Sequence, residues 1–410
     1  MTWLVVVGGL VLLVFLHELG HFSVALAVGM RPGSFYIGFP PALVKFRHKG
    51  VEYGIGMIPL GGLVRIPGMH RPAARDLQGF MEPAVREQPS LAPAVGGVRR
   101  ALEADDFDAA RRAYPDLERE VDAADLTPGA RRSAKRALRD VEEGTAPDAY
   151  WRARTWKRVA VIAAGPLANV FIAFAILFTV FAISGGPSSR PSATVAAVEA
   201  GSPAASAGLQ PGDRIVAVNG RATRTFAAVS RVIRASHGSP VTLAVERAGH
   251  RVTVGPEPTI FQHGRWIFGF NPAAEIVGYS VGKAARTAAS ENWHVVTGTA
   301  SGLGSLFSRQ GQSRLSGPVG IADVAHNQLK VGLTYYLEIL AFVSMSLALL
   351  NLLPLLPLDG GHILFSLIEG VRRRALAREV YERVSVIGIA FIVLVFVIAF
   401  SNDVSGHAPH

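Results

Sequence analysis

The sequence predicts a polytopic α-helical membrane protein with about four transmembrane helices, a membrane-associated β-hairpin sheet and one extracytoplasmic module of short strands. Half of the 410 residues are apolar, and the mean hydropathy is +0.31. Four separate stretches are long and apolar enough to cross a bilayer. Basic residues gather beside these stretches, as the positive-inside rule requires of cytoplasmic loops. No cysteine is present, so a metal site in this chain must use histidine and carboxylate ligands.

The net charge of +10 does not indicate a nucleic-acid partner, because of where the charges lie. Residues 71–150 carry 13 basic and 16 acidic side chains, whereas the rest of the chain carries 28 basic and 15 acidic ones. Much of this excess flanks the apolar stretches. We therefore expect a membrane, and no nucleic acid, as the surrounding partner.

The first predicted transmembrane helix, residues 1–29, contains an HExxH motif formed by His17, Glu18 and His21. On a helix the two histidines share one face, where both imidazoles can bind a single zinc ion. Glu18 is rotated by about a third of a turn and can reach a water on the metal without coordinating it. The motif could arise by chance on a surface helix. Ionisable side chains at membrane depth are costly, however, and usually mark a functional site.

Residues 30–70 predict a membrane-associated β-sheet. Short runs rich in Phe, Tyr, Ile and Val alternate with turns, and His48-Lys49-Gly50 has the composition of a hairpin turn. Such a sheet directly after the metal helix could be a simple cap. It could also offer an edge strand to an extended peptide.

Residues 71–150 predict a cytoplasmic helical insertion. Thr127 and Pro128 are typical of a helix start and Gly144 of a helix end, and a second helix is expected over 103–121, perturbed at Pro115. The mixed charges fit a solvated surface, and no ligand is indicated.

The second transmembrane helix is expected over 159–184. The four basic residues that precede it, Arg152, Arg154, Lys157 and Arg158, place its start in the cytoplasm, so the first helix runs from outside to inside. Gly165-Pro166 interrupts the apolar run. This pair either permits close helix packing or leaves room beside the metal.

Residues 190–258 predict a soluble module of short strands. Between Gly201 and Gly220 a Ser-Pro helix start, a Gly-Leu helix end, a Pro-Gly-Asp turn, an alternating strand and an Asn-Gly turn follow one another. This segment resembles a PDZ domain of the bacterial protease type. The resemblance implies that the module receives a peptide or chain terminus by strand addition, or that it serves as a scaffold or size filter.

The last third of the chain contains an expected amphipathic helix over 277–307, which would lie on the membrane surface, and two further spans. The third transmembrane helix, over 331–360, ends in a motif with Asn351, Pro354, Pro357 and Asp359. The prolines should unwind the helix at membrane depth. Asp359 can supply a third zinc ligand and leave a fourth position open for water, or it can merely cap a helix at the membrane edge.

A run of three arginines at 372–374 places the following loop in the cytoplasm. The fourth transmembrane helix is then expected over 383–401, and it returns the short tail to the outside. The topology closes without contradiction.

Taken together, these motifs resemble the site-2 protease family of intramembrane zinc metalloproteases, of the M50 type. The resemblance is carried by HELGH in the first span, by Asn-x-x-Pro-x-x-Pro-Leu-Asp-Gly in the third and by the PDZ-like module between the second and third spans. It is particularly clear for the bacterial regulator-of-sigma-E-protease group, which cuts anti-sigma factors. Three segments also match in order: Ile58–Gly62, Ala164–Asn169 and Leu315–Ile321. The single PDZ-like module and the insertion at 71–150 depart from the pattern.

The resemblance implies a zinc-dependent intramembrane endopeptidase of the bacterial inner membrane. Its substrates would be transmembrane segments of single-pass proteins, such as anti-sigma factors or signal-peptide remnants, cut in regulated intramembrane proteolysis. The implied residues are Glu18 as catalytic base, His17, His21 and Asp359 as zinc ligands, and Asn351, Pro354, Pro357, Gly61 and Gly62 at the substrate.

Asn351 could instead stabilise the broken helix. Two other classes of protein share some of these features: an inactive PDZ scaffold, which the intact motifs disfavour, and a metal-dependent transporter, which the absence of repeats in the sequence disfavours.

Overall fold

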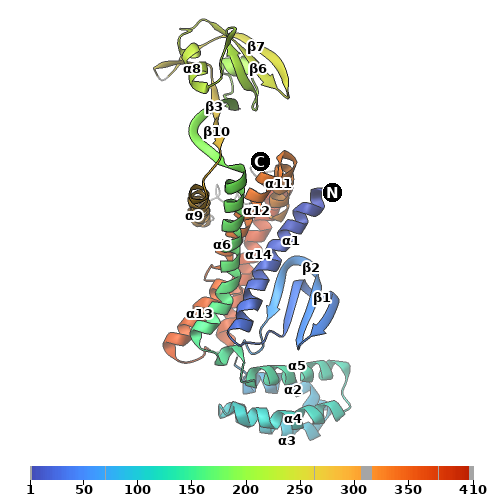
Figure 1. The fold of residues 1–410 in the computed structure, drawn as a ribbon. Helices are drawn as coiled ribbons and strands as arrows, with labels where there is room; N and C mark the ends of the chain where they lie inside the picture. The colour runs from blue at the N-terminus through green and yellow to red at the C-terminus, as the bar shows by residue number, and fades with distance from the viewer. Residues whose placement is uncertain (1, 70, 263, 306–315, 377, 406–410) are drawn as a thin grey trace. The chain divides into compact units, whose positions relative to one another are not determined.

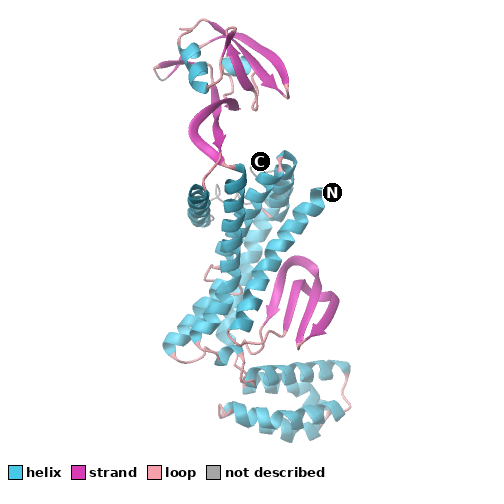
Figure 2. Ribbon diagram, viewed as in Figure 1, coloured by secondary structure: helices cyan, strands magenta, loops and turns pink. Residues whose placement is uncertain are grey.

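The computed structural model describes residues 2–69, 71–262, 264–305, 316–376 and 378–405. The chain divides into two compact units, one formed by Met1–Leu177 with Ala288–His410 and the other by Phe178–Thr287. Helices dominate the first unit and strands the second (Figure 2). Of the ranges named above, residue 1, residue 70, residues 306–307 and residue 315 lie outside the described part of the chain.

The prediction of four membrane-crossing helices is confirmed for the described residues. The helices long and apolar enough to cross a membrane are α1 (Thr2–Ala27), α6 (Thr155–Ser184), α12 (Leu333–Asn351) and α14 (Arg378–Ser405). Within the first unit they run alongside one another (Figure 1). Many of their large apolar side chains are exposed, among them Leu4, Phe171 and Val386. An exposed apolar surface of this kind is stable only where lipid replaces water.

Small residues let these helices approach closely. A Cβ atom on Gly20 of α1 would lie 2.6 Å from the carbonyl oxygen of Ala164 in α6, so the two backbones are in contact. Tyr336 of α12 donates its hydroxyl hydrogen to the carbonyl of Val5 in α1 at 2.9 Å. These contacts fix α1 between α6 and α12.

The first unit contains a helix that the sequence analysis did not predict, α11 (Pro318–Val331). It packs against α1 and α12, with Ala325 buried beside Val6 and Tyr336. Its first turn is capped by Asp403 of α14, whose carboxylate accepts the N–H groups of Gly317 and Gly320 at 2.9 and 3.0 Å. A carboxylate at this position satisfies free N–H groups and the helix dipole together.

The third span is shorter than the predicted 331–360. Helix α12 ends at Asn351, residues 352–358 are not helical, and a separate helix, α13 (Asp359–Arg372), follows. The two prolines explain the break, because neither can donate the N–H that a continuing helix needs. A Cβ atom on Gly360 would lie 2.2 Å from the carbonyl oxygen of Leu352, so only glycine lets α13 start this close to the broken segment. Asp359 therefore lies in the first turn of a new helix.

Strands β1 (Ser34–His48) and β2 (Val51–Arg65) form an antiparallel sheet beside α1 (Figure 1). Residues 34–37 of β1 pair with residues 52–55 of β2 on one side and with residues 62–65 of β2 on the other. Residues 44–48 of β1 also pair with residues 51–55. Each strand must therefore bend and contribute two segments to the sheet. The sheet thus has four strand segments in the order 44–48, 51–55, 34–37, 62–65. Lys49 and Gly50 at the hairpin tip both have positive φ, 49° and 86°, as a type I′ turn requires.

The segment from residue 71 to residue 150 forms a helical bundle with its own apolar core. The helix expected over 103–121 begins only at Phe107, because Asp105 takes a positive φ of 58° and separates it from the preceding helix. The side chains of Asp106 and Thr127 cap the helices that follow them, accepting N–H groups at 2.8 and 3.3 Å. The elements are α2 (Ala74–Glu87), a 3-10 turn (Pro89–Leu91), α3 (Ala92–Glu103), α4 (Phe107–Ala123) and α5 (Pro128–Thr145).

The second unit is a strand-rich domain with sheet order β10-β3-β4-β6-β7, and β5 pairs with β4. It extends beyond the predicted 190–258, because β10 pairs with β3 from Phe270↔Val198 to Val277↔Gly186 and because Phe268 belongs to its core. Its elements are β3 (Gly186–Val198), α7 (Pro203–Ser206), β4 (Arg214–Val218), β5 (Arg221–Ala222), α8 (Phe226–Arg234), β6 (Pro240–Arg247), β7 (His250–Pro258), β8 (Ile260–Gln262), β9 (Arg265–Ile267) and β10 (Phe270–Val277).

An ion pair between a buried carboxylate and a partly exposed arginine stabilises this domain. Asp213 is only 1 % exposed, and its two oxygens accept hydrogen bonds from Nε and Nη2 of Arg247, both at 2.7 Å. Burial by itself would raise the pKa of the Asp213 carboxyl. The bonds from Arg247 and from the N–H of Gln210 outweigh burial and hold this pKa below its ordinary value.

Two further helices differ in length from the predictions. The helix expected over 277–307 is α9 (Val281–Ser305), with Trp293 exposed on it. The fourth span, expected over 383–401, is the longer helix α14, which includes polar residues at both ends.

Candidate metal centre

Three side chains that the sequence analysis selected as metal ligands meet inside the first unit. His17 and His21 are one turn apart on α1, and both are buried. Their Nε2 atoms lie 3.2 Å apart, and Asp359 Oδ2 lies 3.3 Å from the first and 3.4 Å from the second. Donors about 2.0–2.1 Å from a tetrahedral zinc ion would be about 3.3 Å apart. The three atoms thus form one face of a tetrahedron of the size that zinc requires.

The imidazole of His21 is oriented by α6. Its Nδ1 lies 2.8 Å from the carbonyl oxygen of Val161, which can only accept a hydrogen bond. Nδ1 therefore carries the hydrogen, and the lone pair of Nε2 points toward His17 and Asp359.

The imidazole of His17 has a partner that the sequence analysis did not select, Asn169 of α6. The Asn169 amide is completely buried, and its Nδ2 lies 3.2 Å from His17 Nδ1. Its backbone carbonyl accepts the hydroxyl hydrogen of Ser344 at 2.9 Å, whereas its Oδ1 is buried with no partner among the described residues. The sequence does carry a signal for Asn169, because a polar side chain inside an apolar span needs a reason to be there.

Gly165 of α6 forms a wall of the centre. A Cβ atom at this position would lie 2.2 Å from His21 Nε2 and 2.8 Å from His17 Cε1. Of the two explanations for Gly165-Pro166, room beside the two imidazoles is therefore the one that the geometry supports for the glycine.

The sheet reaches the centre at Glu18. A Cβ atom on Gly62 would lie 2.3 Å from Glu18 Cγ and 3.0 Å from its Oε1, so the segment 62–65 runs directly against this carboxylate. Gly61, which precedes it, has a φ of +149°. The edge of the sheet is thus next to the HExxH glutamate.

The residues of the motif at the end of the third predicted span do not all lie at the candidate metal centre. Asn351, the last residue of α12, places its side-chain Nδ2 atom 3.4 Å from His17 Nε2. Pro354 and Pro357 are exposed in the loop between α12 and α13. They shape the path from Asn351 to Asp359 and do not lie among the buried side chains.

Comparison with known proteins identifies the family. The model of peptidase family M50 matches residues 5–395. The chain belongs to peptidase family M50, the site-2 protease family.

Relatives of this M50 peptidase match over nearly their whole lengths. A protein of Agrobacterium fabrum, named as a candidate zinc metalloprotease, is 32 % identical over 96 % of this chain and 93 % of its own. Zinc metalloprotease RasP of Bacillus licheniformis is 30 % identical over 96 % of both chains. Regulator of sigma-W protease RasP of Bacillus subtilis is 29 % identical over 96 % of this chain and 95 % of its own.

The M50 peptidase is a zinc-dependent metallopeptidase. The buried donors fit this metal in kind as well as in distance. Two imidazoles and one carboxylate are a donor set of catalytic zinc sites, in which a fourth position stays open. Asp359 Oδ2 is buried and has no hydrogen-bond donor among the described residues. An unpartnered buried carboxylate oxygen is costly, and a cation beside it removes that cost.

Proposed function

We propose that this M50 peptidase cleaves transmembrane segments of single-pass membrane proteins at a zinc ion held by His17, His21 and Asp359. One observation supports this proposal above all others. Donors from α1 and α13, 3.2–3.4 Å apart, meet within a bundle of membrane-crossing helices, with the HExxH glutamate and a sheet edge beside them.

In this proposal, zinc, Glu18 and Asn351 have separate roles in peptide-bond hydrolysis. When bound, zinc supplies a Lewis acid for the scissile carbonyl and lowers the pKa of a water toward neutrality. Glu18, as general base, takes the proton of the attacking water and delivers it to the leaving amine. Asn351, whose amide lies 3.4 Å from His17 Nε2, can donate to the substrate carbonyl or backbone. Asn351 thereby orients the scissile bond.

Asn169 and Val161 act as positioning groups in this proposal. The orientation of the Asn169 amide in which Oδ1 faces His17 Nδ1 lets the otherwise unpartnered oxygen accept the Nδ1 hydrogen. Both histidines then carry hydrogen on Nδ1 and present Nε2 to the metal. Helix α6 would set both tautomers.

The substrate must be extended before it can be cut, because a transmembrane helix keeps its amide groups in its own hydrogen-bond ladder. The outer sheet segment 62–65 pairs with 34–37 on one side, and Gly62 contacts Glu18. An unwound substrate strand can add to this segment and so be presented to the catalytic groups. Gly61 and Gly62 leave room for that strand, and the loop with Pro354 and Pro357 would border it.

The second unit fits a PDZ domain that receives a peptide or chain terminus. Strand β10 is at one edge of its sheet, and a cavity of about 230 Å³ lies between α8 and residues 265–272. Phe226 and Ile233 of α8 line this cavity with Phe268 and Phe270. An edge strand facing an apolar helix surface is the arrangement that strand addition uses.

The proposed setting is the inner membrane of a bacterium, with the PDZ-like unit outside and the helical insertion inside. The support is the concentration of basic residues before α6 and in the loop before α14. The name of the Bacillus subtilis relative, a regulator of sigma-W protease, favours anti-sigma factors as substrates. Signal-peptide remnants are the second class of single-span substrate that we propose.

The test is cleavage of a tagged single-span substrate in membranes, together with the zinc content of the purified protein. Wild type should cut, Glu18→Gln should bind zinc and not cut, and Asp359→Ala should lose both zinc and cleavage. Zinc-loaded wild type that cuts no member of an anti-sigma-factor and signal-peptide panel would favour the inactive scaffold instead. Cleavage by Glu18→Gln at the wild-type rate would remove Glu18 from the mechanism.

A further inference from the structure

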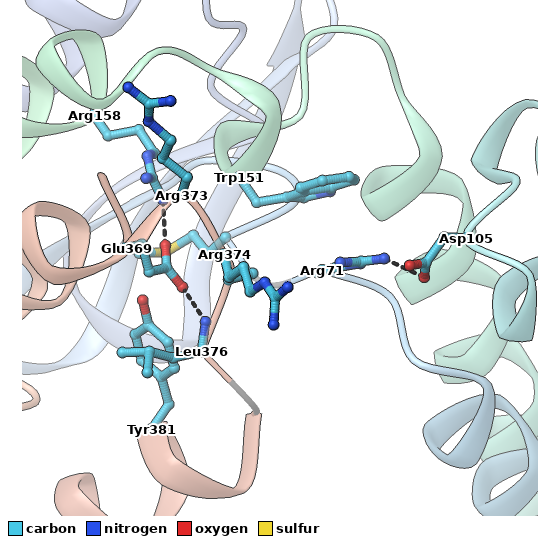
Figure 3. Close-up of a pocket in the computed structure, with 11 residues that line it drawn as sticks. Arg71, Asp105, Trp151, Arg158, Glu369, Arg373, Arg374, Leu376 and Tyr381 are labelled. Atoms are coloured by element: carbon cyan, nitrogen blue, oxygen red, sulfur yellow. Dashed lines mark hydrogen bonds and ion pairs between the residues drawn. The ribbon is translucent and has the colours of Figure 1, made fainter. Parts of the chain in front are cut away.

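A strongly basic pocket, separate from the metal centre, lies where α13, α14 and the start of α6 meet (Figure 3). Its volume is about 540 Å³, within the range of cavities that bind small molecules. The charged side chains that line it are Arg71, Arg158, Arg373, Arg374, Asp105 and Glu369.

Both carboxylates of this pocket are already neutralised. Arg158 donates from Nη1 to Glu369 Oε2 at 2.5 Å, and the N–H of Leu376 donates to Glu369 Oε1 at 2.8 Å. Asp105 forms an ion pair with Arg71. In the described part of the chain, Arg373 and Arg374 are paired with no carboxylate. The pocket thus keeps two uncompensated positive charges.

Two of the cations are held in place before any ligand arrives. The Arg71 guanidinium lies 4.8 Å from the centre of the Phe107 ring and 5.8 Å from that of Trp151. Arg158 is buried, and its Nε has no hydrogen-bond partner among the described residues. In Figure 3 the side chain of Arg374 extends from the α13–α14 loop toward Arg71.

General rules account for only part of this cluster. Basic residues at the end of α13 complement its dipole and obey the positive-inside rule. Neither rule explains why Arg71, from the segment after β2, and Arg158, from the first turn of α6, converge on the same cavity as Arg373 and Arg374.

The position of the pocket indicates the ligand. Its lining residues Trp151 and Arg158 flank the start of α6 at Thr155, and its lining residues Leu376 and Tyr381 flank the start of the fourth apolar span at Glu379. Span ends lie at the depth of lipid headgroups, where basic pockets bind phosphate. We propose that this pocket binds the phosphate group of an anionic ligand, with a phospholipid headgroup as the source that its position favours.

The experiment measures binding and not cleavage, so its outcome is independent of the proposed peptidase mechanism. Phosphatidylglycerol is titrated into the full-length protein in neutral detergent, and bound lipid is counted by native mass spectrometry, with phosphatidylcholine as the zwitterionic comparison. The variant R373Q/R374Q removes two exposed charges without breaking a described ion pair. The control R111Q/R112Q makes the same change of charge on α4, away from the pocket lining.

We expect the Kd for phosphatidylglycerol to rise about 30-fold in R373Q/R374Q and to stay at the wild-type value in R111Q/R112Q. A separate arm follows the thermal midpoint of unfolding in millimolar inorganic phosphate. Protection of wild type but not of R373Q/R374Q by phosphate, without lipid binding, would assign the site to a soluble phosphate compound. Equal binding by R373Q/R374Q and wild type, or no binding of either probe to wild type, would overturn the proposal.

Discussion

Gly165→Ala should remove zinc from the centre by adding a single methyl group. The new Cβ would lie 2.2 Å from His21 Nε2 and 2.6 Å from His21 Cε1. Reaching ordinary contact at 3.4 Å requires a shift of the imidazole by about 1.2 Å, whereas zinc–nitrogen distances tolerate about 0.2 Å. The hydrogen bond from Nδ1 to Val161 resists this shift. We expect zinc affinity to fall about 100-fold or more, and cleavage with it.

The assay for Gly165→Ala is zinc content after equilibration against a series of buffered free zinc concentrations, followed by substrate cleavage at each. Gly8→Ala is the matched control, because it makes the same substitution in a membrane-crossing helix where no atom lies within 4 Å of the new Cβ. Gly8→Ala should bind zinc and cut as wild type does. If Gly165→Ala also had wild-type zinc affinity, the three donors would not be the zinc site of this chain.

Three further predictions concern separate parts of the molecule. Asn169→Ala should lower zinc affinity by about 10–100-fold. Asn169→Asp keeps a hydrogen-bond acceptor and should restore much of that affinity in the same zinc titration. If the two variants had equal zinc affinity, Asn169 would not position His17. Gly62→Ala should leave zinc bound but lower kcat about 100-fold, because the new Cβ displaces Glu18 by about 1 Å. An unchanged kcat would show that catalysis does not depend on the contact between Gly62 and Glu18. Because the pKa of Asp213 is held below its ordinary value, the stability that it contributes is complete above about pH 4 and is lost as the pH falls through its folded pKa. Hydrogen exchange of residues 186–277 should become faster as the pH falls through this range. In Arg247→Gln this dependence on pH should be smaller. If the substitution left the pH profile unchanged, the pair of Asp213 and Arg247 would not be the source of the effect.

Local patterns were sufficient to locate the four membrane-crossing helices and to bring together two of the three candidate metal ligands. An apolar run of 18 or more residues can hardly be anything but a span, and HExxH on a helix places His17 and His21 together whatever the rest of the chain does. The two prolines correctly predicted the break after Asn351, because proline acts on its own neighbours.

The predictions of secondary structure were wrong where contacts with distant segments decide whether a helix or strand forms. Helix α13 was not predicted, and only its first two residues fall within the range expected for the third span. Helix α11 was missed, and it depends on a cap from Asp403, more than 80 residues away in sequence. Strand β10 lies beyond the predicted module because its pairing with β3 is non-local.

The sequence by itself determined the class of molecule, its family and the chemical types at its centre, because these follow from short motifs and from the length of apolar runs. Only the tertiary structure decided that Asp359 lies within 3.4 Å of both histidines, that Asn169 and Gly165 of α6 contact the imidazoles, and that Gly62 contacts Glu18. These are contacts between segments far apart in the chain, and no periodicity within a segment encodes which other segment will pack against it.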